Sequence, residues 1–249
     1  MRYLVASDLH YNLRQLDWIA DQAGEFDAVV LGGDHVDLAG RVDLDAQISL
    51  LSAYFSRLAG ITTVIANSGN HDLSGRLANG EKAALWLYHL DPRVVTDGAS
   101  VAVGADLVSV CAWWEGPHTR GNVEDQLEAD AARRRDVGGV WAWAYHSPPD
   151  RSPTSWSGRR HFGDDVLNEL IERFRPDLVF AGHVHESPFR PDGSWFDVLD
   201  GTLVLNAGRQ PGPAPAHLVV DTAAREATWY SYEGDVTVEL PANPTAGLS

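Results

Sequence analysis

Five short apolar runs in this 249-residue chain each end in aspartate, histidine or asparagine. The polar ends are Asp8-Leu9-His10, Asp34, Asn70-His71-Asp72, His146 and His183-Val184-His185. Each run reads as a buried strand, and helical patterns separate the first three, which predicts βαβ units with parallel strands. Because sites in such sheets gather at the carboxyl ends of the strands, we expect these polar side chains to meet.

Local signals place the other elements. Asn12, Asp43 and Asp164 are suitable residues to begin helices, and two further helices are expected over 79–90 and, as a charged helix, over 123–136. Strands are expected over 2–7, 28–31, 61–66, 94–95, 100–103, 107–110, 140–145 and 178–182. Later strands at 203–205, 217–221 and 227–231 are expected to form a second sheet.

Charge and cysteine content exclude several classes of protein. The formal net charge of −16 argues against a binder of duplex nucleic acid, and equally against an anionic membrane surface. No apolar stretch approaches the ~20 residues of a membrane span, and Met1 leads straight into a strand without a leader, so we expect a cytoplasmic protein. Cys111 is the single cysteine, which excludes an intramolecular disulfide and a cysteine-rich zinc site. The sequence does not indicate the oligomeric state.

Taken singly, each polar motif has an ordinary structural explanation. Asp8 could begin a helix, Asp34 could belong to the turn after Gly33, and His183 and His185 could bond to loop backbone. Taken together, they require several unrelated coincidences at strand ends. The set therefore favours a metal site, and oxygen and imidazole ligands suit manganese, iron or zinc.

The ordered pattern D-x-H, G-D, G-N-H-D, a lone His and G-H-x-H resembles the calcineurin-like metallophosphoesterase superfamily. The resemblance implies an α/β fold, a four-layer α/β/β/α sandwich of two mixed sheets. It would form one domain over 1–240, and the content of proline, alanine and glycine predicts a flexible tail over 241–249. It also implies two metal ions, with the following ligands: Asp8, His10 and His185 for one, Asn70, His146 and His183 for the other, and Asp34 bridging both. Within D-x-H and H-x-H, an extended backbone would point both side chains the same way.

The resemblance also implies the chemistry. The metals would lower the pKa of water, and a hydroxide between them would attack phosphorus. His71 would contact the phosphate and protonate the leaving oxygen, and Asp72 would orient the His71 imidazole by accepting its other N–H. Tyr11 and His35 depart from the usual pattern. Tyr11 would narrow the cleft, and His35 would either support the ligands or touch substrate, the former being favoured.

The implied activity is hydrolysis of a small phosphoester, such as a nucleotide, by a phosphodiesterase. A phosphatase using the same site is the alternative, and a non-catalytic scaffold of the same fold ranks below both. For segment 113–139, a solvated helix face is favoured over a lid across the site. The candidate substrate contacts are Trp113, Trp114, Arg159, Arg160 and His161.

Overall fold

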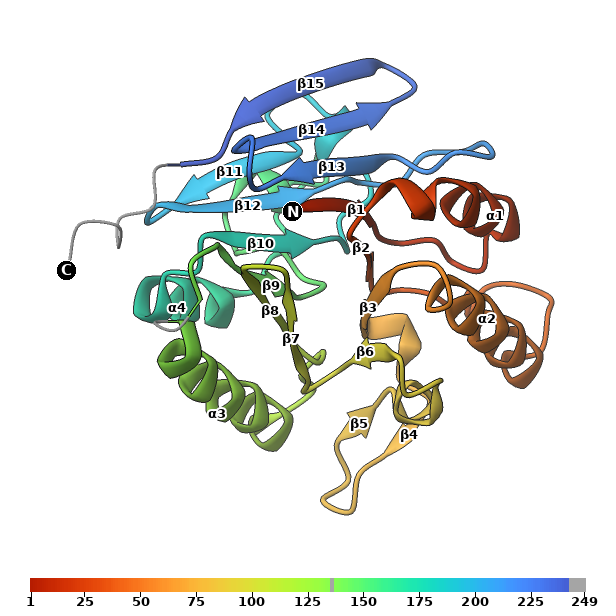
Figure 1. The fold of residues 1–249 in the computed structure, drawn as a ribbon. Helices are drawn as coiled ribbons and strands as arrows, with labels where there is room; N and C mark the ends of the chain where they lie inside the picture. Colours follow the sequence, from red (N-terminus) through yellow and green to blue (C-terminus); the bar gives the residue numbers. More distant parts are fainter. Residues whose placement is uncertain (135–136, 242–249) are drawn as a thin grey trace.

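Two mixed sheets pack face to face in the computed structural model, which describes residues 1–134 and 137–241 (Figure 1). The first sheet has the strand order β15-β14-β13-β1-β2-β3-β6. Its strands are β1 (Arg2–Ala6), β2 (Ala28–Gly32), β3 (Thr63–Asn67), β6 (Val94–Thr96), β13 (His217–Asp221), β14 (Glu226–Ser231) and β15 (Gly234–Glu239). Strands β1, β2, β3 and β6 are parallel to one another, and β13 joins them antiparallel to β1.

The second sheet has the order β11-β12-β10-β9-β8-β7. Its strands are β7 (Ser100–Val103), β8 (Asp106–Val110), β9 (Trp141–Ala144), β10 (Leu178–Ala181), β11 (Phe196–Leu199) and β12 (Thr202–Asn206). The four central strands run parallel, and β7 and β11 close the two edges antiparallel. Parallel strands deliver their carboxyl ends to one edge, which brings the predicted ligands into range of each other.

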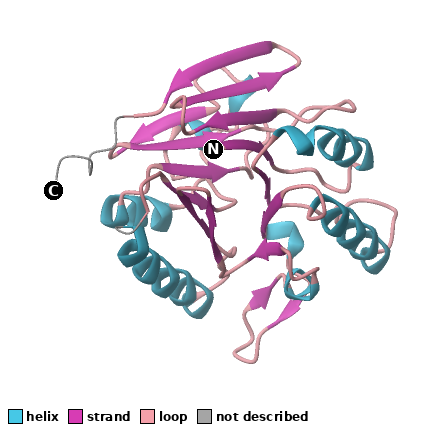
Figure 2. Cartoon of the chain, in the orientation of Figure 1, coloured by secondary structure: helices cyan, strands magenta, loops and turns pink. Residues whose placement is uncertain are grey.

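Helices cover the outer face of each sheet, as Figure 2 shows. Helices α1 (Leu13–Gln22) and α2 (Leu44–Leu58) pack on the first sheet, and α3 (Pro117–Arg133) and α4 (Asp165–Phe174) pack on the second. Alternation along β1 turns Tyr3 toward the second sheet and Leu4 toward α1 and α2. The result is three apolar layers between four structural layers, which confirms the predicted α/β/β/α sandwich.

The three predicted helix starts are confirmed by side-chain caps. Asn12 accepts a hydrogen bond from the N–H of Gln15, Asp43 from Asp45, and Asp164 from Val166.

The helix predicted over 79–90 is wrong. The segment instead holds the second strand of a hairpin, β5 (Lys82–Ala83), which pairs with β4 (Gly75–Arg76), and then a 3-10 helix (Leu85–His89). Gly80 has φ of +91° in the turn, a conformation that an α-helix does not contain. Other 3-10 helices are Ala23–Glu25, Asn70–Asp72, Pro153–Ser155 and Ser187–Phe189.

Helix α3 starts at Pro117 rather than at the predicted Val123, and the predicted end at Asp136 lies outside the described residues. Val123 and Leu127 on this helix are buried against the second sheet. Arg133 pairs with the carboxylate of Asp130 on the same helix. The favoured solvated helix face for 113–139 and the alternative of a lid both stay predictions.

The predicted grouping of the last strands is partly wrong. Strand β12 does lie in the second sheet, but β13 and β14 extend the first sheet beside β1. Strands β11 and β15 were not predicted. Of the tail predicted over 241–249, residues 242–249 lie outside the described part of the chain. Within residues 1–134 and 137–241, no helix has the length and apolar character of a membrane span.

Candidate metal centre

Seven side chains from five strand ends converge at the edge where the two sheets meet. Two groups of candidate ligands form there, and within each group the ligand atoms lie within 4.8 Å of one another. The first group is Asp8, His10, Asp34 and His185, and the second is Asp34, His146 and His183. The structure thus places the Asp34 carboxylate in both groups, the position that the resemblance implies for a bridging ligand.

Short distances between ligand atoms define each group. In the first, Nε2 of His185 lies 3.1 Å from Oδ1 of Asp8 and 3.1 Å from Nε2 of His10. In the second, Nε2 of His146 lies 3.3 Å from Oδ2 of Asp34. Asn70 joins the second group, because its Oδ1 lies 2.9 Å from Nδ1 of His183.

The backbone that presents the ligands is not extended, contrary to the expectation for D-x-H and H-x-H. Asp8, His10, Asp34 and His183 have φ of 56°, 42°, 53° and 66°. Such left-handed conformations are costly for residues other than glycine and persist where the surroundings hold them. Here Asp8 N–H donates to Gly33 O at 3.1 Å and His10 N–H to Asp34 O at 3.0 Å, so the loops after β1 and β2 hold each other.

Glycine at position 33 is required by close packing as well as by its φ of +83°. A Cβ there would lie 2.6 Å from Nδ1 of His146, a distance that no Cβ tolerates. The imidazole of His146 therefore fits directly against the backbone of the G-D motif.

The hydrogen bonds of the His146 ring indicate whether these residues fit a cation. Its Nδ1–H donates to the carbonyl of Gly32 at 2.6 Å, which fixes the ring and leaves Nε2 as the atom aimed at the ligand groups. This Nε2 is buried without a hydrogen-bond partner, since its 3.3 Å approach to Asp34 lacks hydrogen-bond geometry. A buried imidazole nitrogen without a hydrogen-bond partner, beside the carboxylates of Asp8 and Asp34, can coordinate a cation, so the residues fit the ions.

Electrostatics agree with this fit. Burial alone would lower the pKa of His146, but the carboxylates of Asp34 and Asp8 outweigh it and raise the pKa to about 10. Burial would raise the pKa of Asp8, yet His146 and His185 bring it down to about 2. Burial would likewise raise the pKa of Asp34, and the neighbouring His146 lowers it instead. The site therefore holds two buried carboxylates that remain charged and favour cations.

His71 lies at the rim of this centre, and Asp72 does not orient it. The backbone N–H of His71 donates to Oδ1 of Asp34 at 2.8 Å, and its ring packs edge-on to His10. The predicted bond from Asp72 to the imidazole is wrong, because Nδ1 of His71 has no partner among the described residues. Asp72 instead accepts the backbone N–H groups of His35, Val36 and Gly69, which ties the loops after β2 and β3 together.

The side chain of His35 is buried. Its ring packs against Phe55 and Trp86, and its Nε2 lies 2.9 Å from Asn67 O. Its backbone N–H is one of the donors to Asp72, which agrees with the favoured supporting role.

Two of the five predicted substrate contacts lie beside the centre. The Trp113 ring is 5.4 Å from the His183 ring and 5.8 Å from the His146 ring, between centroids. Arg159 lines a cavity together with His183 and His185. The other three do not line that cavity: Trp114 stacks on Tyr145, Arg160 lies over the ring of Phe162, and His161 bonds to Ser155.

Sequence reasoning missed Arg209. It lines a cavity with His185. Its positive charge also lowers the pKa of His10, although burial lowers this pKa more and the carboxylates of Asp8 and Asp34 oppose both effects. The residue follows Asn206-Ala207-Gly208 at the end of β12. A basic residue so close after a strand of the second sheet is the signal that could have identified it.

Comparisons with known proteins give matches for the sequence and for the fold. A family model described as calcineurin-like phosphoesterase matches residues 1–187. The structure of TT1561 from Thermus thermophilus aligns with a TM-score of 0.57 at 16% identity, covering 96% of this chain and 98% of that one. Purple acid phosphatase PPD1 from yellow lupin (Lupinus luteus) seeds aligns with a TM-score of 0.57 at 12% identity, covering 96% of this chain and 53% of that one. A search of curated proteins gives no significant match.

Proposed function

The chain belongs to the calcineurin-like phosphoesterase family, a family of phosphoester hydrolases, and from that premise we propose that it is a metal-dependent phosphodiesterase acting on a small phosphoester such as a nucleotide. The observation that carries the proposal is the Asp34 carboxylate, which both groups of candidate ligands share. One carboxylate between two sets of imidazoles is an arrangement suited to a pair of ions.

Ligand roles follow from the two groups. Asp8, His10 and His185 would hold one ion, Asn70, His146 and His183 the other, and Asp34 both. When bound, manganese, iron or zinc ions at these positions would lower the pKa of water and stabilise negative charge on phosphorus-bound oxygens.

His71 would move a proton in this proposal. Its ring Nε2 lies 3.9 Å from Oδ2 of Asp34, and its side chain is 34% exposed, so it faces both the ligands and the open side of the centre. An imidazole can give a proton near neutral pH, and His71 would deliver it to the leaving oxygen.

Arginines at the rim support an anionic substrate. Arg159 and Arg190 line one cavity with His185, and Arg209 lines another with the same histidine. Within the described residues, these three guanidinium groups form no ion pair, whereas Arg120, Arg134 and Arg173 do. Unpaired cations around the site of a chain with net charge −16 would attract a small phosphoester. The same overall charge disfavours an extended nucleic acid.

Hydrolysis of two chromogenic esters tests the proposal. We expect manganese-loaded protein to hydrolyse bis-p-nitrophenyl phosphate faster than p-nitrophenyl phosphate, and chelation to abolish both activities. Faster hydrolysis of the monoester would identify a phosphatase using the same site. Turnover of neither ester after loading with manganese, iron or zinc would contradict enzymatic function and favour a scaffold.

A further inference from the structure

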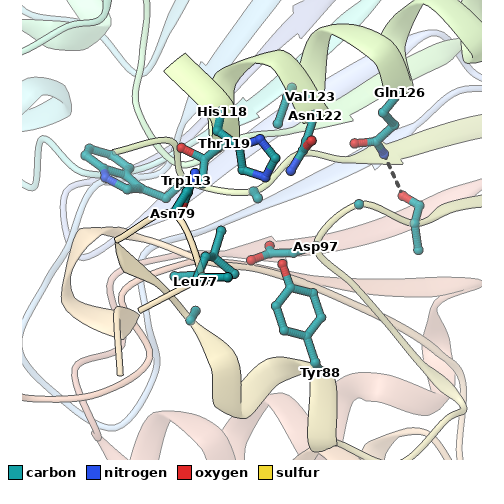
Figure 3. A pocket seen from close by; sticks show the side chains of 16 residues that line it. Leu77, Asn79, Tyr88, Asp97, Trp113, His118, Thr119, Asn122, Val123 and Gln126 are labelled. Atoms are coloured by element: carbon teal, nitrogen blue, oxygen red, sulfur yellow. Dashed lines mark hydrogen bonds between the residues drawn. The ribbon is translucent and has the colours of Figure 1, made fainter. Parts of the chain in front are cut away.

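A cavity of about 740 Å³ lies beside the metal centre, between helix α3 and the segment that carries the β4–β5 hairpin (Figure 3). None of the candidate metal ligands lines it. Its volume is in the range of pockets that hold small organic ligands. Figure 3 shows His118, Asn122 and Gln126 on the α3 side and Asp97, Tyr88 and Leu77 on the opposite side.

The walls of this cavity combine apolar surface with a few polar groups. Leu77, Val123 and several alanines supply the apolar part, and Tyr88 and Trp113 supply aromatic rings. Oε1 of Gln126 is buried without a hydrogen-bond partner in the described part of the chain, while its Nε2 donates to Ala99 O at 2.9 Å. Gln126 therefore carries an acceptor without a partner at the wall of the cavity.

Asp97 provides a second acceptor. One of its oxygens accepts the backbone N–H of Ser68 at 2.8 Å, and the residue is only 7% exposed. Burial raises the pKa of this carboxyl to about 7, so at neutral pH about half of the molecules carry it as the uncharged acid. Among the described residues that line the cavity there is no arginine or lysine, which makes it unsuited to a phosphate group.

Trp113 and Ser68 connect this cavity to the metal centre. Trp113 lines the cavity, and its ring also lies 5.4 Å from the ring of His183. Ser68 accepts the backbone N–H of Trp113 at 2.9 Å and stands two residues before Asn70 in the chain. A group attached to a phosphate at the centre could thus extend past Trp113 into the cavity.

We propose that this cavity binds the nucleobase of the substrate, an inference that rests on the proposed function of the neighbouring centre. A nucleobase is planar, so it can pack against Tyr88 and Trp113. It is uncharged and carries N–H groups, which match Gln126 and Asp97. Purely aliphatic groups would leave both acceptors unsatisfied, and a second phosphate would find no cation.

Binding of nucleosides without phosphate tests the cavity independently of catalysis. The probes are adenosine, guanosine, cytidine and thymidine, measured with metal-free protein by saturation-transfer NMR. We expect saturation of the base protons of at least one nucleoside. Asn122→Trp, at an exposed position on α3 that lines the cavity, should fill it and abolish the transfer. Asp125→Trp, exposed on the same helix but outside the lining, should leave it unchanged.

A second variant keeps the test valid if Asn122→Trp does not fold. Tyr88 is 52% exposed, so Tyr88→Ala should fold and still weaken nucleoside binding by about tenfold, the effect of losing one aromatic stacking partner. Thermal melting followed by circular dichroism verifies that each variant is folded.

Hydrolysis of a nucleotide ester tests whether the cavity contributes to substrate binding. We expect Asn122→Trp to raise KM for thymidine 5′-(p-nitrophenyl phosphate) about tenfold, and Asp125→Trp to leave this KM unchanged. No transfer to any nucleoside, or equal transfer in folded Asn122→Trp, would overturn the base site. Those results leave the proposed function standing if bis-p-nitrophenyl phosphate is still hydrolysed. Absence of that hydrolysis would instead contradict the proposed function itself.

Discussion

Asp34 holds His71 through the backbone rather than through the imidazole. Oδ1 of Asp34 accepts the His71 N–H at 2.8 Å, while its Oδ2 lies 3.9 Å from the ring Nε2. The carboxylate shared by both ligand groups therefore also fixes the position of the residue expected to donate a proton. The ring itself keeps the freedom to approach a leaving oxygen.

His71→Ala should slow esters with poor leaving groups much more than activated aryl esters. A general acid contributes about 10²–10⁴-fold, and p-nitrophenolate leaves without needing a proton. The measurement is kcat/KM for an alkyl phosphodiester and for bis-p-nitrophenyl phosphate, on wild type and variant. Equal losses for the two esters would mean that His71 only positions substrate.

Asp34→Asn should reduce bound metal below two ions per chain, because it weakens the one ligand that both groups share. Metal analysis after purification without chelator gives the stoichiometry. Added manganese should raise the melting temperature of the wild type, since a ligand that binds only the folded state stabilises it. The same rise in Asp34→Asn would show that the ion binds elsewhere.

Arg159→Ala should raise KM for a phosphodiester by about tenfold with little change in kcat, as expected for loss of a charged contact to a phosphate oxygen. Arg160→Ala is the matched control, because Arg160 carries the same charge in the same loop but does not line the cavity that Arg159 shares with His183 and His185. Steady-state kinetics on both variants separates the two positions. If Arg160→Ala raised KM as much, a general charge effect would explain the result.

Asp97→Asn should stabilise the protein increasingly as pH rises from about 4 to about 7. Burial raises the pKa of the Asp97 carboxyl to about 7, so the folded state retains a proton that the unfolded chain releases near its ordinary value. The stabilising contribution of Asp97 is complete below that ordinary value and is lost as pH rises through about 7. Each pKa unit corresponds to roughly 1.4 kcal/mol.

Urea unfolding of wild type and Asp97→Asn at several pH values, in the absence of metal and ligand, measures this difference. Because all other groups titrate in both proteins, their effects cancel. A difference in unfolding free energy that does not change with pH would contradict the buried, protonated carboxyl.

The site was predictable because its motifs are local. Each ligand stands within a few residues of an apolar strand, so sequence order alone placed Asp8, Asp34 and His146 at strand ends. The hairpin at 75–83 could have been predicted, because Asn79-Gly80 is a strong turn signal. The apolar residues that follow it suggested a helix instead. Pro117 likewise marks the first turn of α3.

The pairing of β13 with β1 was not predictable from local pattern. It pairs Arg2 with Asp221, which are far apart in the sequence, and the residues of neither strand indicate which strand will pair with it. The role of Asp72 was missed for a related reason. Its carboxylate accepts hydrogen bonds from the backbone N–H groups of His35 and Val36. Because almost every residue has a backbone N–H, the sequence does not indicate such contacts.

Strand β13 has a consequence for any shortened chain. A protein ending at Ser187 would keep every ligand motif, yet it would lose β13 and expose the unpaired backbone edge of β1, the strand that leads into Asp8. It would also lose Arg209. The ligand motifs therefore end well before the last strand that the fold needs. A fragment that contains only these motifs should aggregate.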